Sequence, residues 1–98
     1  MRKVTLRLFG APFLAPGKLL AQQLIIKLND QQVASWLLTS AEPREQTVEL
    51  PAGALRGINV LMFEMPDAAS PKSLGVSEDD RLLGFNVQWI EIGQNRLQ

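Results

Sequence analysis

The stretch QQLIIKLNDQQVASWLL, residues 22–38, decides the fold class. On both sides of Asn29-Asp30, apolar residues recur at every second position, which is the period of a half-buried β-strand. Asn and Asp adopt left-handed backbone at low cost, so this dipeptide predicts a turn between the two halves. We therefore predict a β-hairpin over residues 23–38.

Two further stretches, KVTLRL at residues 3–8 and REQTVEL at residues 44–50, alternate in the same way. GAPFLAPG at residues 10–17 contains two prolines and two glycines and predicts a loop. INVLMFEM at residues 58–65 is apolar in both phases, as expected of a central strand that is covered on both sides. The segment that follows, residues 66–81, predicts a long loop.

The last strand changes phase. In FNVQWIEI, residues 85–92, the first apolar residues stand at odd positions and the closing ones at even positions. A β-bulge near Gln88-Trp89 reconciles the two halves, because one extra residue exchanges the inner and outer faces of a strand. The bulge turns Trp89 towards a partly exposed position. The side chains then expected to face the core are Phe85, Val87, Ile90 and Ile92.

These stretches are short, and none has the pattern of a helix of ten residues. The connections are too short for the helical crossovers that parallel strands require. The sequence therefore predicts an all-β fold: an antiparallel β-sandwich of six to eight short strands, in a single domain over residues 1–98.

The composition excludes several classes of function. Ten basic and ten acidic side chains give zero net charge, so we expect no nucleic-acid partner. Cysteine, histidine and tyrosine are absent, which removes the thiolate nucleophile, the commonest general base and the commonest metal ligand. We therefore expect a non-enzymatic protein without catalytic residues. No run approaches 18 apolar residues, so we also expect no direct membrane span.

The long loop carries a charged run, SEDDR at residues 77–81. We expect no cofactor and no metal site. The alternative is a Ca²⁺ site at Glu78, Asp79 and Asp80, because calcium takes six to eight oxygen ligands and a carboxylate cluster supplies several of them. Asp79, Asp80 and Arg81 are candidates for binding sugar hydroxyls. The alternative is an ionic latch, in which Arg81 pairs with one Asp and pins the loop to the last strand. Removing one partner of such a latch, if it is buried, costs several kcal/mol.

Trp36 and Trp89 are the two tryptophans of the chain. Each is a candidate for stacking on a sugar, because the flat apolar face of an indole matches the C–H face of a pyranose ring. The alternative for each is packing in the core or between the sheets. The phenylalanines are expected to pack in the core or against loops: Phe9, Phe13, Phe63 and Phe85.

The end of the chain, ASPKSLGVSEDDRLLGFNVQWIEI, resembles a known family. It is similar to the closing motif of the small β-sandwich domain at the C-terminus of some bacterial membrane-bound glycosyltransferases and phosphoglycerol-transferase-like proteins. Residues 24–38 and 48–65 resemble the hairpin and the central strand of that domain. The residues that carry the closing motif are Ser70-Pro71, Leu74-Gly75, Ser77, Asp79 or Asp80, Arg81 and Leu83-Gly84.

The resemblance implies a jelly-roll accessory domain, a topology that we favour over an immunoglobulin-like one, in an extracytoplasmic, periplasmic location. It carries no ligand residues across. Because this chain lacks the membrane region of those transferases, we expect an excised piece or a free-standing relative.

We expect a carbohydrate-binding-like module that recognises or positions glycan beside the catalytic membrane region of a parent transferase. The alternative is a structural module that docks onto a partner protein or onto a second copy of itself, as a homodimer. The candidate ligand-binding residues are Trp89, Trp36, Asp79, Asp80 and Arg81.

Overall fold

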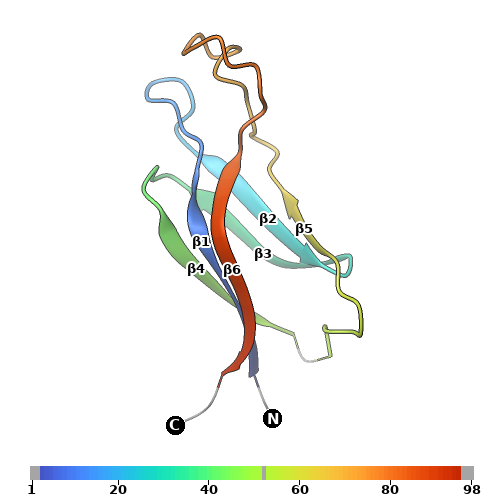
Figure 1. Cartoon of the computed structure of the whole chain (residues 1–98). Helices are drawn as coiled ribbons and strands as arrows, with labels where there is room; N and C mark the ends of the chain where they lie inside the picture. Colours follow the sequence, from blue (N-terminus) through green and yellow to red (C-terminus); the bar gives the residue numbers. More distant parts are fainter. Residues whose placement is uncertain (1–2, 52, 96–98) are drawn as a thin grey trace.

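The computed structural model describes residues 3–51 and 53–95, and these residues form β-strands and loops without a helix. The strands pair antiparallel in two three-stranded sheets of order β4-β1-β6 and β3-β2-β5, which lie as two layers in Figure 1. The predicted all-β antiparallel class is therefore confirmed. The strands are β1 (Lys3–Pro12), β2 (Gln22–Leu28), β3 (Gln31–Leu38), β4 (Arg44–Leu50), β5 (Leu61–Glu64) and β6 (Phe85–Asn95).

The core lies between the central strands of the two sheets. Every second residue of β1 and of β2 points inward, so the alternation seen in the sequence becomes the two walls of one apolar interior. Side chains from the other strands pack around this cluster and cover its edges. The fully or almost fully buried members are Leu6, Leu8, Leu24, Ile26, Leu28 and Leu50.

The predicted hairpin is confirmed, with β2 and β3 joined at Asn29-Asp30. Both turn residues have positive φ, 51° and 70°, as a two-residue hairpin turn requires. The Asn29 side chain also ties down the connection that leads to β5. Its Oδ1 accepts from the Val60 N–H at 2.8 Å, and its Nδ2 donates to the Ala54 carbonyl at 3.0 Å.

The predicted bulge in the last strand is also confirmed. Along β1 and β6, Phe9 lies opposite Trp89, whereas the next residue, Gly10, lies opposite Val87. Gln88 is therefore the extra residue that shifts the phase of β6. The shift places Trp89 on the outer face of the sheet and returns the isoleucines that follow to the inner face, opposite buried residues of β1.

Two expectations about strand positions are wrong. Residues 58–65 do not form a covered central strand: β5 spans four residues at the edge of its sheet, and the preceding Ile58 is 87% exposed. Within β5, Leu61 and Phe63 pack against the core cluster, whereas Met62 is 48% exposed, so one face of this strand is open to solvent. Strand β1 runs on through Pro12 instead of ending before the loop at residue 10, because β6 pairs with this extension where β4 does not.

Among the described residues, no helix is long and apolar enough to cross a membrane.

Gly10 is expected to be required for the bulge. A methyl group added there meets the Asn86 carbonyl oxygen and the Phe85 ring, and the backbone atom cannot move aside cheaply. We expect Gly10→Ala to lower the free energy of unfolding by about 1–3 kcal/mol, measured by chemical denaturation. Gly57→Ala, where nothing lies near the added methyl, is the matched control. Equal stability of the two variants contradicts the described register.

A candidate binding face on the outer side of the β4-β1-β6 sheet

The outer face of the β4-β1-β6 sheet places aromatic and charged side chains in adjacent rows. Residues directly opposite one another on paired antiparallel strands share a face, so the register defines these rows. Three neighbouring strands span about 10 Å, which makes the two rows a compact patch. We call it the outer-face patch: Glu45, Phe9 and Trp89 in one row, and Thr47, Arg7 and Glu91 in the next.

Phe9 and Trp89 form the aromatic centre of the outer-face patch. Their ring centroids are 5.7 Å apart and their planes differ by 10°, so the rings are stacked. Trp89 remains 41% exposed. The stack fixes the orientation of the indole and leaves part of it open to solvent, which confirms the expected partial exposure of Trp89. The expectation that Phe9 packs in the core or against a loop is wrong.

An ion pair flanks the aromatic rings. Arg7 Nη2 donates to Glu91 Oε1 at 2.6 Å, and both side chains are about half exposed. This hydrogen bond and the charge of Glu91 raise the pKa of Arg7, and the charge of Glu45 adds to the effect. The row therefore presents a guanidinium paired with the Glu91 carboxylate, with Glu45 in the neighbouring row, and both rows keep donors and acceptors that a polar ligand can use.

The charged run of the long loop (residues 65–84) forms a local pair. Arg81 donates from Nε to Asp79 Oδ1 at 3.0 Å and from Nη2 to Oδ2 at 2.7 Å, and its backbone N–H also donates to Oδ1. The expected pairing of Arg81 with an Asp is confirmed. The pair does not pin the loop to β6, however, because both partners belong to one turn and the Arg81 side chain is 74% exposed.

Contacts outside the charged run hold the long loop instead. Ala69 and Leu83 exchange two hydrogen bonds, of 3.1 and 2.9 Å, across the base of the loop. Lys18 Nζ donates to the Leu74 carbonyl at 2.6 Å and joins the long loop to the loop between β1 and β2. The two loops lie together at one end of the molecule (Figure 1). Their attachment therefore does not depend on the charged run.

The calcium hypothesis for Glu78, Asp79 and Asp80 stays a prediction. In the part of the chain that the structure describes, no three acidic side chains gather closely enough to hold a metal ion. Both carboxylate oxygens of Asp79 already accept hydrogen bonds from Arg81.

Trp36 lies on the inner side of β3, opposite the buried Leu24, and packs against the core cluster. This position agrees with the alternative that Trp36 packs in the core, and the core contacts explain the position of the indole without a ligand. The structure therefore does not bring the two tryptophans together, because Trp89 lies on the outer face of the other sheet.

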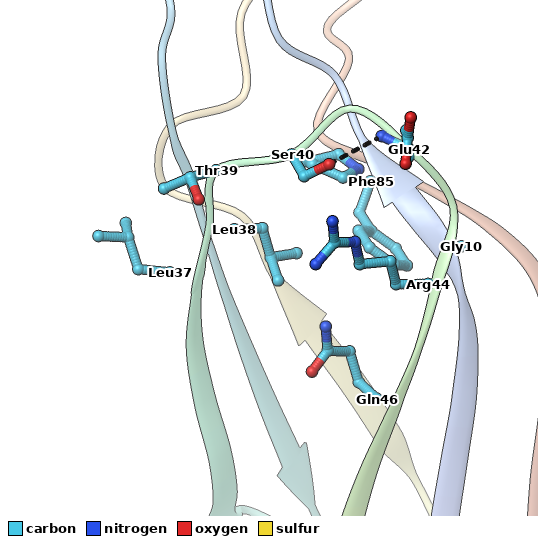
Figure 2. A pocket seen from close by; sticks show the side chains of 10 residues that line it. Gly10, Leu37, Leu38, Thr39, Ser40, Glu42, Arg44, Gln46 and Phe85 are labelled. Carbon is cyan, nitrogen blue, oxygen red and sulfur yellow. Dashed lines mark hydrogen bonds between the residues drawn. The ribbon is translucent and has the colours of Figure 1, made fainter.

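A small pocket lies between the β3–β4 loop and the start of β6. Figure 2 shows Arg44 and Gln46 beside this space, with the Phe85 ring behind them. Ser40 Oγ accepts from the Glu42 N–H at 3.3 Å and shapes the loop above it. The volume of the pocket, about 130 Å³, is below the range typical of small-molecule sites.

A wider pocket of about 630 Å³ lies where the long loop meets β6. Most of its lining residues are apolar by type, Phe13, Met65 and Leu82 among them, but polar atoms form almost half of the lining surface, and Arg81 and Asn86 contribute to it. Arg81 is engaged by Asp79 here, as Arg7 of the outer-face patch is by Glu91. Trp89 lines neither of these two pockets.

Sequence reasoning missed most of the outer-face patch. The alternation of β1 already places Phe9 in phase with Arg7 on its polar side. Its pairing with Trp89, and that of Arg7 with Glu91, joins residues about eighty positions apart in the chain. No local sequence pattern shows which residues of two distant strands lie opposite one another. Phe9, an aromatic residue on the polar side of β1, was therefore the one signal in the sequence for the patch.

The Asp79–Arg81 pair predicts a pH response. The hydrogen bonds from the Arg81 guanidinium and then from its backbone N–H lower the pKa of Asp79 to about 2. The pair therefore stabilises the fold above the ordinary carboxyl pKa of about 4, and this contribution is lost as the pH falls through about 2. In an NMR titration we expect Arg81→Gln to return the Asp79 midpoint towards 4, and Asp80→Asn to leave it unchanged. An ordinary Asp79 midpoint in the unmodified protein contradicts the pair.

Comparisons of the chain with protein-family models, curated proteins and solved structures gave no match.

Proposed function

We propose that this chain is a non-catalytic glycan-recognition module, built on a jelly-roll-like β-sandwich, that binds sugar on its outer-face patch. The observation that carries the proposal is the solvent-facing stack of Trp89 on Phe9 beside the Arg7–Glu91 ion pair. A sugar ring has an apolar face and hydroxyl groups around its rim. An exposed aromatic ring can stack on that face, and neighbouring charged side chains can form hydrogen bonds with the hydroxyls.

The patch is preorganised for such a ligand. The Trp89 indole is held by its stack on Phe9, so it loses little side-chain freedom when a ring packs on it. The Arg7 guanidinium is held by Glu91, and Glu45 stands at the other end of the aromatic row. Carboxylate oxygens accept from sugar hydroxyls and guanidinium N–H groups donate to them, so both kinds of hydrogen bond are available within the two rows.

The cellular setting is proposed from the resemblance of the closing motif alone. On this resemblance, the proposed location of the module is outside the cytoplasm, beside the catalytic membrane region of a transferase that builds or decorates surface glycans. There the module would hold the acceptor glycan near the enzyme, and the domain itself would carry no reaction. The zero net charge of the chain suits an uncharged ligand such as a glycan.

A second candidate function, docking onto a partner protein or onto a second copy of this chain, is favoured by one observation. The inner side of β6 carries apolar residues that stay about 40% exposed, although they face the same way as the core. Such a strip on the edge of a sheet is typical of a protein-interaction surface.

Fluorescence of a single-tryptophan variant tests glycan binding. In Trp36→Phe, the emission reports Trp89 alone, and we expect a blue shift on titration with at least one oligosaccharide of glucose, mannose or N-acetylglucosamine. Replacing the plate by Trp89→Ala should weaken binding about tenfold, which corresponds to the loss of one stacking contact. This second effect is measured by calorimetry.

Ile58→Ala, an exposed residue away from the patch, is the control and should bind like the unmodified protein. If no oligosaccharide of the panel shifts the emission or releases heat, the glycan proposal fails.

A further inference from the structure

Strand β6 is an exposed edge. It is the longest strand described, at 11 residues, and it pairs with β1 on one side alone. The other side presents a row of backbone N–H and C=O groups that can template a further strand.

The features that usually protect an edge are weak in β6. The segment after the bulge, WIEIG at residues 89–93, contains neither proline nor lysine, and its one charge, on Glu91, is paired with Arg7. The other edges differ: β5 spans four residues, β4 carries Arg44, Glu45 and Glu49, and the pairing of β3 is interrupted by a register shift opposite Ile26-Lys27.

The inner side of β6 is only half covered. Ile90 and Ile92 lie opposite Leu8 and Leu6, which are fully buried, yet they are themselves 40% and 42% exposed. Val87, before the bulge, is 38% exposed. Exposure differs between the two strands because β1 is the central strand of its sheet and β6 is an edge strand. The β6 side chains therefore face the interior but are not completely covered. An added strand would supply that cover.

We propose that the occupant of this edge is the β6 strand of a second copy, paired antiparallel about a two-fold axis that passes near Glu91. In this register Ile90 faces Ile92 of the other copy, and Ile92 faces Ile90, so four isoleucines form one apolar row on the inner side. Trp89 lies opposite Gly93 of the other copy on the outer side. Gly93 has open space above it, which leaves room for an indole.

The charges permit this contact. The chain has zero net charge, so two copies do not repel each other as whole molecules. The two Glu91 side chains meet at the axis, and each brings its own Arg7, 2.6 Å away, to offset the like charges. The result is a row of alternating partners, Arg7–Glu91 of one copy followed by Glu91–Arg7 of the other, on the outer face of a continuous six-stranded sheet.

Analytical ultracentrifugation tests the association. We expect a reversible monomer–dimer equilibrium between about 10 µM and about 1 mM, since the apolar row is narrow. Ile92→Lys should raise the dissociation constant at least about tenfold, because it places an unpaired charge in that row. Ile58→Lys makes the same exchange at an 87% exposed position away from β6 and should leave the constant unchanged. A monomer at every concentration overturns the proposal, as does equal association of both variants.

Cysteine cross-linking tests the register and does not depend on Ile92→Lys being folded. The chain has no cysteine, so Glu91→Cys introduces one thiol per copy, and a two-fold axis near residue 91 brings the two Cα atoms to about 5 Å, within disulfide range. Thr47→Cys, in the same row at the opposite edge of the sheet, is the control. We expect mild oxidation to form a disulfide dimer at least about ten times faster with Glu91→Cys than with Thr47→Cys, because the interface holds the two Glu91→Cys thiols close together. Equal rates overturn the register. Neither experiment involves a sugar, so their outcome is separate from that of the glycan proposal.

Discussion

A strand can turn only one of its two sets of alternating side chains towards a core, and β6 carries apolar residues in both phases. The extra residue at Gln88 resolves this conflict. Before Gln88, the residues in phase with Val87 face inward. After Gln88, the residues in phase with Ile90 face inward, and Trp89 lies on the outer face. Both the outer-face patch and the apolar inner strip of β6 exist because of this one shift.

The shift depends in turn on β1. Leu6 and Leu8 anchor the inner side of the sheet in a fully buried cluster, so β6 must match its own inner residues to them. Gly10 makes the change of register possible, because it leaves room for the Asn86 carbonyl and the Phe85 ring where β6 comes closest. The same strand carries Phe9 and Arg7 on its outer side, and so it positions both contacts that define the candidate site.

Local signals were sufficient for features that depend on neighbouring residues. The turn at Asn29-Asp30 follows from two residue types that tolerate positive φ, and the bulge at Gln88 from a change of phase within one strand. The order of strands in a sheet is different, because it depends on which distant segments pair. Residues 58–65 are apolar enough for a central strand and nevertheless lie at an edge. For the same reason the Phe9–Trp89 stack was not predicted, and Arg81 found a partner two residues away instead of on the last strand.

Cross-strand nuclear Overhauser effects between β1 and β6 are the most direct test of the bulge at Gln88, because they report which backbone protons lie opposite one another. We expect Phe9 to contact Trp89 and Gly10 to contact Val87, with no direct partner for Gln88 on β1. An unbroken register, in which Phe9 contacts Trp89 and Gly10 contacts Gln88, would contradict this expectation, because the phase of β6 would then not change and the indole and the isoleucines could not occupy the faces described.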